Sequence, residues 1–260
     1  MKASSLIAAA LLAAGTLLAS SAHAGAKPIP VYGVQVVRST PHDINAFTEG
    51  LFYLDGFFYE STGLEGHSSV RKVKVETGQV LQRATLPPEM FGEGIAPWNG
   101  RLVGLTWKEQ KGFVLDIDSF DTKGEFGYPG EGWGLTHDDT EMVMSDGTAD
   151  IRFLNPTTLV ESHRIHVTAD GKPVAQLNEL EWVEGEIYAN IWQTDRIARI
   201  DPKTGEVVGW IDCKGLLPMK DFTPQHTDVL NGIAYDPATK RLWLTGKFWP
   251  KVFEVRLVKR

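Results

Sequence analysis

The chain has 260 residues, of which 42% are hydrophobic and 23% charged, a balance typical of a globular protein and not of a disordered one. Its formal net charge is −7 and it has no run of Lys and Arg, which argues against a nucleic-acid partner. Cys213 is the only cysteine, so no intramolecular disulfide can form and stability must come from core burial and a closed topology.

The N-terminus has the pattern of a secretory signal peptide. Lys2 precedes a mostly apolar run, Leu6–Ala19, and Ala22-His23-Ala24 has the small-x-small form of a cleavage site. We expect cleavage after Ala24, with residues 1–24 as the signal peptide and 25–260 as one folded domain. A retained anchor is the alternative, but the run is short for a membrane span, which needs roughly 20 residues. The predicted location is therefore periplasmic or secreted, with no membrane partner.

The rest of the chain repeats one unit five times. Each copy contains an apolar residue just after a Glu-Gly-like step, and these residues are Leu51, Ile95, Leu135, Leu180 and Ile233. Their spacings are 44, 40, 45 and 53 residues, and the longest contains an insertion at 216–228. In each copy a turn signal, such as Asp55-Gly56, leads into a short alternating strand. These second strands are FFYES, RLVGL, EMVMS, EIYAN and RLWLT.

Four short antiparallel strands in a unit of about 40–50 residues are typical of a propeller blade, so we predict an all-β fold, a five-bladed β-propeller. The last unit supplies only three strands, and one strand without a partner, Val31–Val37, precedes the first unit. We expect this N-terminal strand to complete the last blade and close the ring. The alternative is a β-sandwich, although sandwiches rarely repeat a Glu-Gly-apolar step in register.

The repeat predicts a ligand site at one mouth of the central channel, because the turn before the first strand and the end of the second strand share a face. The turns supply Glu49, Glu93, Trp133, Asn178, Glu179 and Asn231, and the ends of the second strands supply Trp107, Trp192 and Lys247. Glu93, between two glycines, would then stand in a circle of Trp, Asn and Lys. Aromatic walls with few polar groups are typical of a pocket, and they would raise the pKa of Glu93 towards neutrality, as suits a general acid/base.

Each of these side chains also has a simpler interpretation. Glu93 alone would pass for a solvated turn carboxylate, Asn178 for a turn cap and Lys247 for a surface residue, while the tryptophans of the circle would pass for core. We assign four further tryptophans to packing between blades: Trp182, Trp210, Trp243 and Trp249. No metal or other cofactor is expected, since the seven histidines lack metal-ligand spacing and Phe120 stands where a calcium loop needs an oxygen ligand.

Several long segments resemble the glutaminyl-peptide cyclotransferases of the plant and bacterial type. They include FGEGIAPWNGRLVGLTW, YPGEGWGLT, LNELEWVEGEIYANIWQTDRIARIDPKTG and VLNGIAYDPATKRLWLTGKFWP, and the resemblance runs from about Val31 to the C-terminus. It implies a five-bladed propeller enzyme that converts the N-terminal glutamine of peptides or proteins to pyroglutamate and releases ammonia without a metal. By similarity, Glu93 is the general acid/base.

The same resemblance implies roles for the surrounding residues. Phe91, Trp107, Trp133 and Trp192 would shape the pocket, while Asn178 and Lys247 would hydrogen-bond the substrate. Glu49 stands where plant members have glutamine, which leaves open whether it binds the α-ammonium group or is structural. We expect a monomer. The alternatives are a non-catalytic propeller that binds N-terminal peptide segments, and a metal-dependent propeller lactonase with Glu93, Asn178 and Asn231 as ligands.

Overall fold

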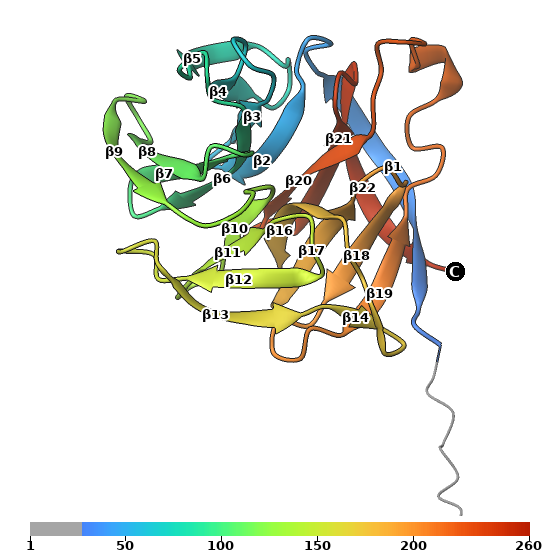
Figure 1. Cartoon of the computed structure of the whole chain (residues 1–260). Helices are drawn as coiled ribbons and strands as arrows, with labels where there is room; N and C mark the ends of the chain where they lie inside the picture. Colours follow the sequence, from blue (N-terminus) through green and yellow to red (C-terminus); the bar gives the residue numbers. More distant parts are fainter. Residues whose placement is uncertain (1–27) are drawn as a thin grey trace, which may run out of the picture.

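The computed structural model describes residues 28–260, so the predicted signal peptide lies outside the described residues. Within this range the structure is all-β, as predicted, apart from one 3-10 turn, η1 (Met219–Asp221), in the insertion at 216–228. Three four-stranded sheets and one eight-stranded sheet lie around a common centre (Figure 1), and a further sheet has two strands. Across residues 28–260, no helix is long and apolar enough to span a bilayer.

The sheets follow the five repeated units of the sequence. The first three units form separate sheets. The first sheet is β2 (Thr48–Leu54), β3 (Phe57–Thr62), β4 (Ser69–Lys74) and β5 (Val80–Thr85), and the second is β6 (Gly92–Trp98), β7 (Arg101–Thr106), β8 (Lys111–Asp116) and β9 (Thr122–Gly127). The third is β10 (Leu135–His137), β11 (Met142–Ser145), β12 (Asp150–Leu154) and β13 (Glu161–His166). The fourth unit is β16 (Leu177–Val183), β17 (Glu186–Ile191), β18 (Arg196–Ile200) and β19 (Val207–Asp212). The fifth is β20 (Leu230–Asp236), β21 (Arg241–Gly246) and β22 (Lys251–Lys259), joined by β1 (Val31–Pro41).

The N-terminal strand β1 completes the last unit, as the sequence predicts. It pairs antiparallel with β22 along its length, from Tyr32 opposite Lys259 to Pro41 opposite Lys251. It also pairs in parallel with β19, where Val31 lies opposite Trp210, and this pairing was not predicted. The last two units therefore share one eight-stranded sheet. A second unpredicted feature is the small hairpin of β14 (Thr168–Ala169) and β15 (Lys172–Pro173) between the third and fourth units.

Two-residue turns set the register of the inner hairpins. At Asp55-Gly56, Asn99-Gly100 and Glu184-Gly185 both residues have positive φ, with values between 47° and 89°. Positive φ at both positions gives the tight hairpin turn whose twist matches that of the flanking strands. The turns predicted at these three places are confirmed, and they start β3, β7 and β17 at the expected residues.

The first strands of the units, β2, β6, β10, β16 and β20, lie at the centre (Figure 1). Each contacts the next one along the chain, and β20 contacts β2. They approach closely because the residue before each repeat's apolar position is glycine in four units: Gly50, Gly94, Gly134 and Gly232. A Cβ at Gly134 would lie 2.1 Å from the carbonyl oxygen of Asn178. In the fourth unit this position is Glu179, whose buried side chain accepts hydrogen bonds from the backbone of Leu51 and Ile233.

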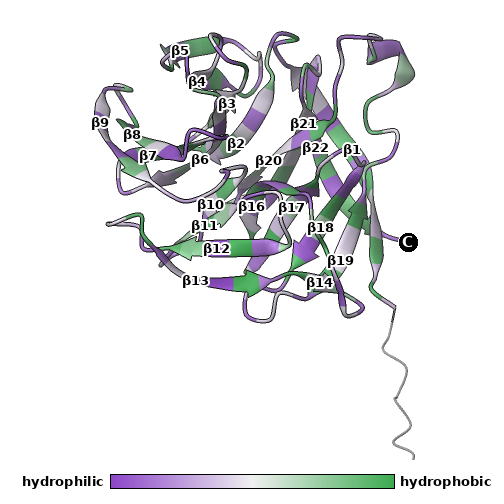
Figure 2. Cartoon of the chain, viewed as in Figure 1, coloured by the Kyte–Doolittle hydropathy of each residue, from purple (hydrophilic) through white to green (hydrophobic). Residues whose placement is uncertain are grey.

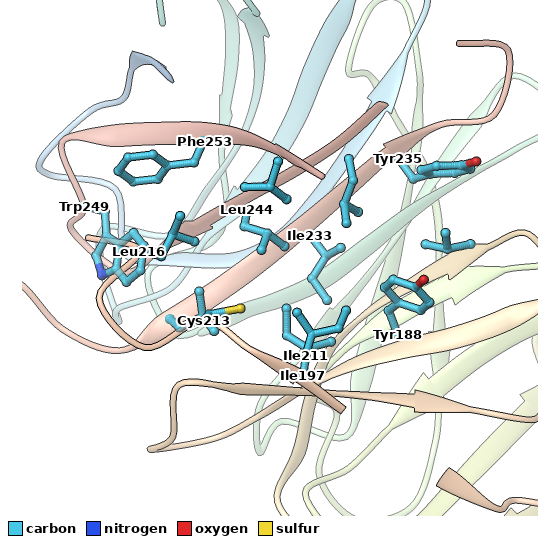
Figure 3. Packing of buried hydrophobic residues seen from close by; sticks show 14 residues of the cluster. Tyr188, Ile197, Ile211, Cys213, Leu216, Ile233, Tyr235, Leu244, Trp249 and Phe253 are labelled. Carbon is cyan, nitrogen blue, oxygen red and sulfur yellow. The ribbon is translucent and has the colours of Figure 1, made fainter. Parts of the chain in front are cut away.

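Each pair of neighbouring units shares a hydrophobic cluster, because the middle strands bury both faces. Figure 2 shows green hydrophobic segments recurring along these strands. Between the fourth and fifth units, Ile197 and Ile211 face Ile233 and Leu244 (Figure 3). Cys213 belongs to the same cluster, and burial raises the pKa of its thiol, so it packs as an apolar side chain. Trp243 stacks on Tyr53 of the first unit at 5.0 Å, which confirms its predicted packing role.

Candidate active site

A pocket of about 320 Å³ lies at one end of the central strands. All eight side chains predicted for the site line it: Glu49, Phe91, Glu93, Trp107, Trp133, Asn178, Trp192 and Lys247. None of the four tryptophans assigned to packing lines this pocket. The structure therefore brings together residues from all five units, although they are separated by up to 198 positions along the chain.

The repeat explains why these side chains converge. Trp107, Trp192 and Lys247 each follow the last residue of a second strand, β7, β17 and β21 respectively. Their backbone N–H groups make equivalent hydrogen bonds to residues that precede the first strands: Trp107 to Phe91 at 3.0 Å, Trp192 to Gln176 at 2.9 Å and Lys247 to Val229 at 2.9 Å. Three copies of one hairpin thus deliver three different side chains to equivalent places around the pocket.

Glu93 is a buried carboxyl group, with 5% of the residue exposed. Burial is the largest cause that raises its pKa well above the usual range, and the charge of Glu49 raises it further. Lys247 acts in the opposite direction, while Glu109 and Glu131 add to the increase. Among residues 28–260, these groups act on Glu93 through charge and not through hydrogen bonds, so its oxygen atoms stay available to a substrate. Such a group can accept and return a proton near neutral pH.

Glu49 and Lys247 form a buried ion pair beside Glu93, with 2.7 Å between Lys247 Nζ and Glu49 Oε1. Asn231 donates to the other carboxylate oxygen at 3.3 Å. Burial raises the pKa of Glu49 to about 7, against the lowering effect of Lys247. Lys247 Nζ also lies 4.4 Å from the centre of the Phe47 ring. The pair is therefore held from several sides, and two of the three ammonium protons remain for a ligand.

Two pairs of rings form most of the aromatic wall of the pocket. Phe91 and Trp107 have centroids 5.4 Å apart, and Trp133 lies nearly perpendicular to Trp192 at 5.6 Å. Both Trp107 and Trp133 donate their indole N–H to the same oxygen of Glu131, at 2.8 and 2.9 Å. These rings line the same pocket as Glu93, whose pKa is raised chiefly by burial.

Two residues of the predicted circle do not line the pocket. Asn231 turns its amide to Glu49 and to the carbonyl oxygen of Thr48, at 2.9 Å from the latter. Glu179 accepts hydrogen bonds from the backbone N–H groups of Leu51, at 3.2 Å, and Ile233, at 2.9 Å. The prediction placed them at the mouth because of their spacing, which gives no information on which way a side chain turns at a crowded centre.

Four other pocket residues were missed by the sequence reasoning: Phe47, Gln193, Asp228 and Val229. Phe47 could have been found, because it stands four positions before Leu51 just as Phe91 stands four before Ile95. Val229 could have been found in the same way, because it stands four positions before Ile233. Asp228 lies at the end of the insertion at 216–228, which has no counterpart in the other units. Gln193 follows Trp192 but carries no signal of its own.

A larger cavity, of about 760 Å³, opens at the other end of the central strands. Three of its acidic residues have local structural partners: Asp138 binds Thr140, Asp236 binds Thr239 and Glu184 pairs with Lys240. We place the site in the smaller pocket because all eight predicted side chains line it. The larger cavity also has a buried carboxyl group, Glu181, but that group accepts a hydrogen bond from the N–H of Tyr235, whereas the Glu93 carboxyl oxygens have no such partner within residues 28–260. Nowhere in residues 28–260 do three His, Cys, Asp or Glu side chains gather as a set of metal ligands.

Three comparisons with known proteins all identify similarity to glutaminyl cyclotransferases. The family model described as "Glutamine cyclotransferase" matches residues 7–257. A glutaminyl-peptide cyclotransferase of Arabidopsis thaliana is 40% identical over 230 residues, which cover 86% of this chain and 71% of that protein. The crystal structure of Myxococcus xanthus glutaminyl cyclase is similar with a TM-score of 0.84 and 38% identity, over 90% of this chain and 100% of that one. The resemblance identified from the sequence is thereby confirmed.

Proposed function

Because the chain belongs to the glutamine cyclotransferase family, we propose that it is a glutaminyl-peptide cyclotransferase that converts the N-terminal glutamine of peptides or proteins to pyroglutamate. The observation that carries this proposal is Glu93, a buried carboxyl group with a raised pKa in a pocket with aromatic walls. The pocket volume of about 320 Å³ suits one side chain and an α-amine better than an extended peptide.

The proposed reaction needs two proton transfers, one from the α-amine to Glu93 and one from Glu93 to the leaving nitrogen. The α-amine of the substrate attacks its own side-chain amide carbon, and the Glu93 carboxylate takes the proton that the amine nitrogen loses. The bond from that carbon to the amide nitrogen then breaks as Glu93 returns the proton, and ammonia leaves. Glu93 ends in the form in which it began. An α-amine has a pKa of about 7.7–8.0, which a carboxylate with a raised pKa can match.

The other pocket residues would orient the substrate, because nucleophile and electrophile belong to the same residue and must be folded towards each other. In this proposal Phe91, Trp107, Trp133 and Trp192 enclose the glutamine side chain. Asn178 and Lys247 hydrogen-bond its amide and polarise the carbonyl group. We assign Glu49 to holding Lys247, on the basis of their buried ion pair.

We also propose that the five units form a five-bladed propeller. The closed cycle of contacts between β2, β6, β10, β16 and β20, with one hydrophobic cluster between each pair of neighbouring units, supports this arrangement. The signal-peptide pattern at residues 1–24 supports export to the periplasm or the outside of the cell. We propose that the exported protein is a single catalytic domain, residues 25–260, that works as a monomer without a metal.

The test is ammonia release from a Gln-Ala dipeptide by the purified protein starting at Gly25, with and without EDTA. We expect release that resists EDTA and falls by at least about 100-fold in Glu93→Gln, whose thermal unfolding should stay close to that of the wild type. Glu125→Gln makes the same change at an exposed residue of β9 and should keep full activity.

Each other outcome would overturn part of the proposal. Full activity in Glu93→Gln would exclude this carboxyl group as the acid/base. No release by the wild type would favour a non-catalytic protein that binds N-terminal segments. Release that disappears with EDTA would favour a metal-dependent enzyme.

A further inference from the structure

Glu131 does not line the pocket, yet it holds two of the pocket's walls. It lies in the segment 128–134 between β9 and β10. One of its oxygens, Oε2, accepts the indole N–H of Trp107 at 2.8 Å and that of Trp133 at 2.9 Å. Trp107 follows β7 of the second unit, whereas Trp133 precedes β10 of the third. A single carboxylate oxygen therefore links walls that come from two different sheets.

The backbone around Glu131 is fixed independently of these two bonds. Gly132 donates its N–H to the carbonyl oxygen of Trp107 at 3.0 Å, and Trp133 donates its N–H to that of Ser145 at 3.0 Å. A Cβ at Gly132 would lie 2.4 Å from the hydroxyl oxygen of Tyr128, so this segment packs closely against its surroundings. The carboxylate is thus presented from a firmly held segment, as a group must be if it is to orient others.

The indole N–H is the only hydrogen-bond donor of a tryptophan side chain, so its partner sets the rotation of the ring. Trp107 contacts Phe91, and Trp133 contacts Trp192. Fixing the first ring of each pair therefore also limits the second. Hydrogen bonds to a charged acceptor are stronger than those between neutral groups, which makes a carboxylate effective in this place.

We propose that Glu131 is a positioning residue that orients Trp107 and Trp133 around the N-terminal glutamine of the substrate. This inference rests on the proposed function. Glu131 has a second, electrostatic effect that can be measured separately. Its negative charge adds to those of Glu49 and Glu109 in raising the pKa of Glu93, against Lys247.

Two variants separate these effects. Glu131→Gln keeps an oxygen that can accept both indole protons but removes the charge, whereas Glu131→Ala removes both. We expect Glu131→Ala to raise KM for a Gln-Ala dipeptide about tenfold with little change in kcat, because both indole hydrogen bonds are lost but the rings stay in the pocket. In Glu131→Gln, KM should stay within about twofold of the wild type, and the acidic limb of kcat/KM should move to lower pH by roughly half a unit.

The direct readout does not depend on activity. In a ¹H–¹⁵N spectrum the eight tryptophans give eight indole signals, and Trp107→Phe and Trp133→Phe assign two of them. We expect those two signals to move in Glu131→Ala and the others to stay, while the matched control Glu125→Gln changes none. If the proposed function were wrong, the wild type would release no ammonia but these two signals would still move. Unmoved signals, or a lower kcat at unchanged KM, would reduce Glu131 to a structural role and overturn the proposal.

Discussion

Glu179 and Glu181 carry two carboxyl groups into the centre of the molecule, where backbone N–H groups bind them. Glu181 accepts from the N–H of Tyr235 at 2.9 Å, in the same way that Glu179 accepts from Leu51 and Ile233. Burial is the largest cause that raises the pKa of both well above the usual range, despite the opposing effect of these bonds. The protonated form of each is therefore favoured in the folded state.

This shift makes stability depend on pH in a defined direction. The unfolded chain loses the Glu181 proton near the ordinary pKa of 4.5, whereas the folded chain keeps it to a higher pH. The contribution of Glu181 is therefore fully present below pH 4.5 and is lost as pH rises through the raised pKa. Glu181→Gln keeps an acceptor oxygen and cannot ionise. The free energy of unfolding of Glu181→Gln should therefore rise relative to that of the wild type as pH increases. The expected rise is up to about 1.4 kcal/mol for each pH unit between 4.5 and the raised pKa of Glu181.

Urea unfolding at pH 5, 6, 7 and 8 measures this gain. Glu76→Gln, at an exposed turn, is the control and should differ from the wild type by a constant amount. A constant difference for Glu181→Gln as well would mean that Glu181 ionises in the folded protein as it does in the unfolded chain.

At the scale of single strands, neighbouring units pack closely because glycine residues stand where their first strands meet. The N–H of Gly94 in β6 donates to the carbonyl oxygen of Trp133 at 2.7 Å. A Cβ on Gly94 would lie 2.4 Å from the backbone nitrogen of Leu135, and backbone atoms cannot move away as a flexible side chain can. The glycine after Glu93 thus has a packing role between β6 and β10.

Gly94→Ala is therefore expected to destabilise the protein by about 3 kcal/mol or to prevent folding. The matched control is Gly124→Ala in β9, where a Cβ meets nothing within 4 Å and which should stay within about 0.5 kcal/mol of the wild type. Denaturant unfolding followed by circular dichroism compares the two. Equal stability of both variants would show that β6 and β10 can separate without cost.

The sequence predicts the strands well because each unit repeats the same alternation and three of them share the same two-residue turn. Asn99-Gly100 and Glu184-Gly185 mark their hairpins locally, so no knowledge of the neighbouring sheet is needed. The link between Glu131 and the two tryptophans could not be predicted in this way, since it depends on the distance between two sheets. For the same reason the inward turn of Asn231 and the parallel pairing of β1 with β19 were missed.

For the molecule as a whole, β1 is the strand that connects the two ends of the chain. It lies between β19 and β22, and it is the only partner they share in the sheet formed by the described residues. Without it, both strands would expose unpaired backbone groups along an edge. A chain that begins at His42 is therefore expected to aggregate or to lose its cooperative unfolding transition, whereas one that begins at Pro28 should behave as the full domain.

Size-exclusion chromatography and thermal unfolding of the two truncated chains measure this difference. A monomeric chain from His42 with an unchanged melting transition would mean that the ring is stable without its closing strand. Loss of the transition in both chains would instead assign a stabilising role to the residues before Pro28.

The place occupied by Glu179 has a consequence for how such a ring can be assembled from copies of one ancestral segment. Five identical units with glycine there would leave the amides of Leu51 and Ile233 without their shared acceptor. Five units with glutamate would crowd five carboxyl groups around one axis, where the central strands approach closely. One unit must therefore differ from the other four at this position, and the five units are not interchangeable. The symmetry of the repeat is broken at Glu179, and this difference supplies the hydrogen-bond acceptor that the buried amides need.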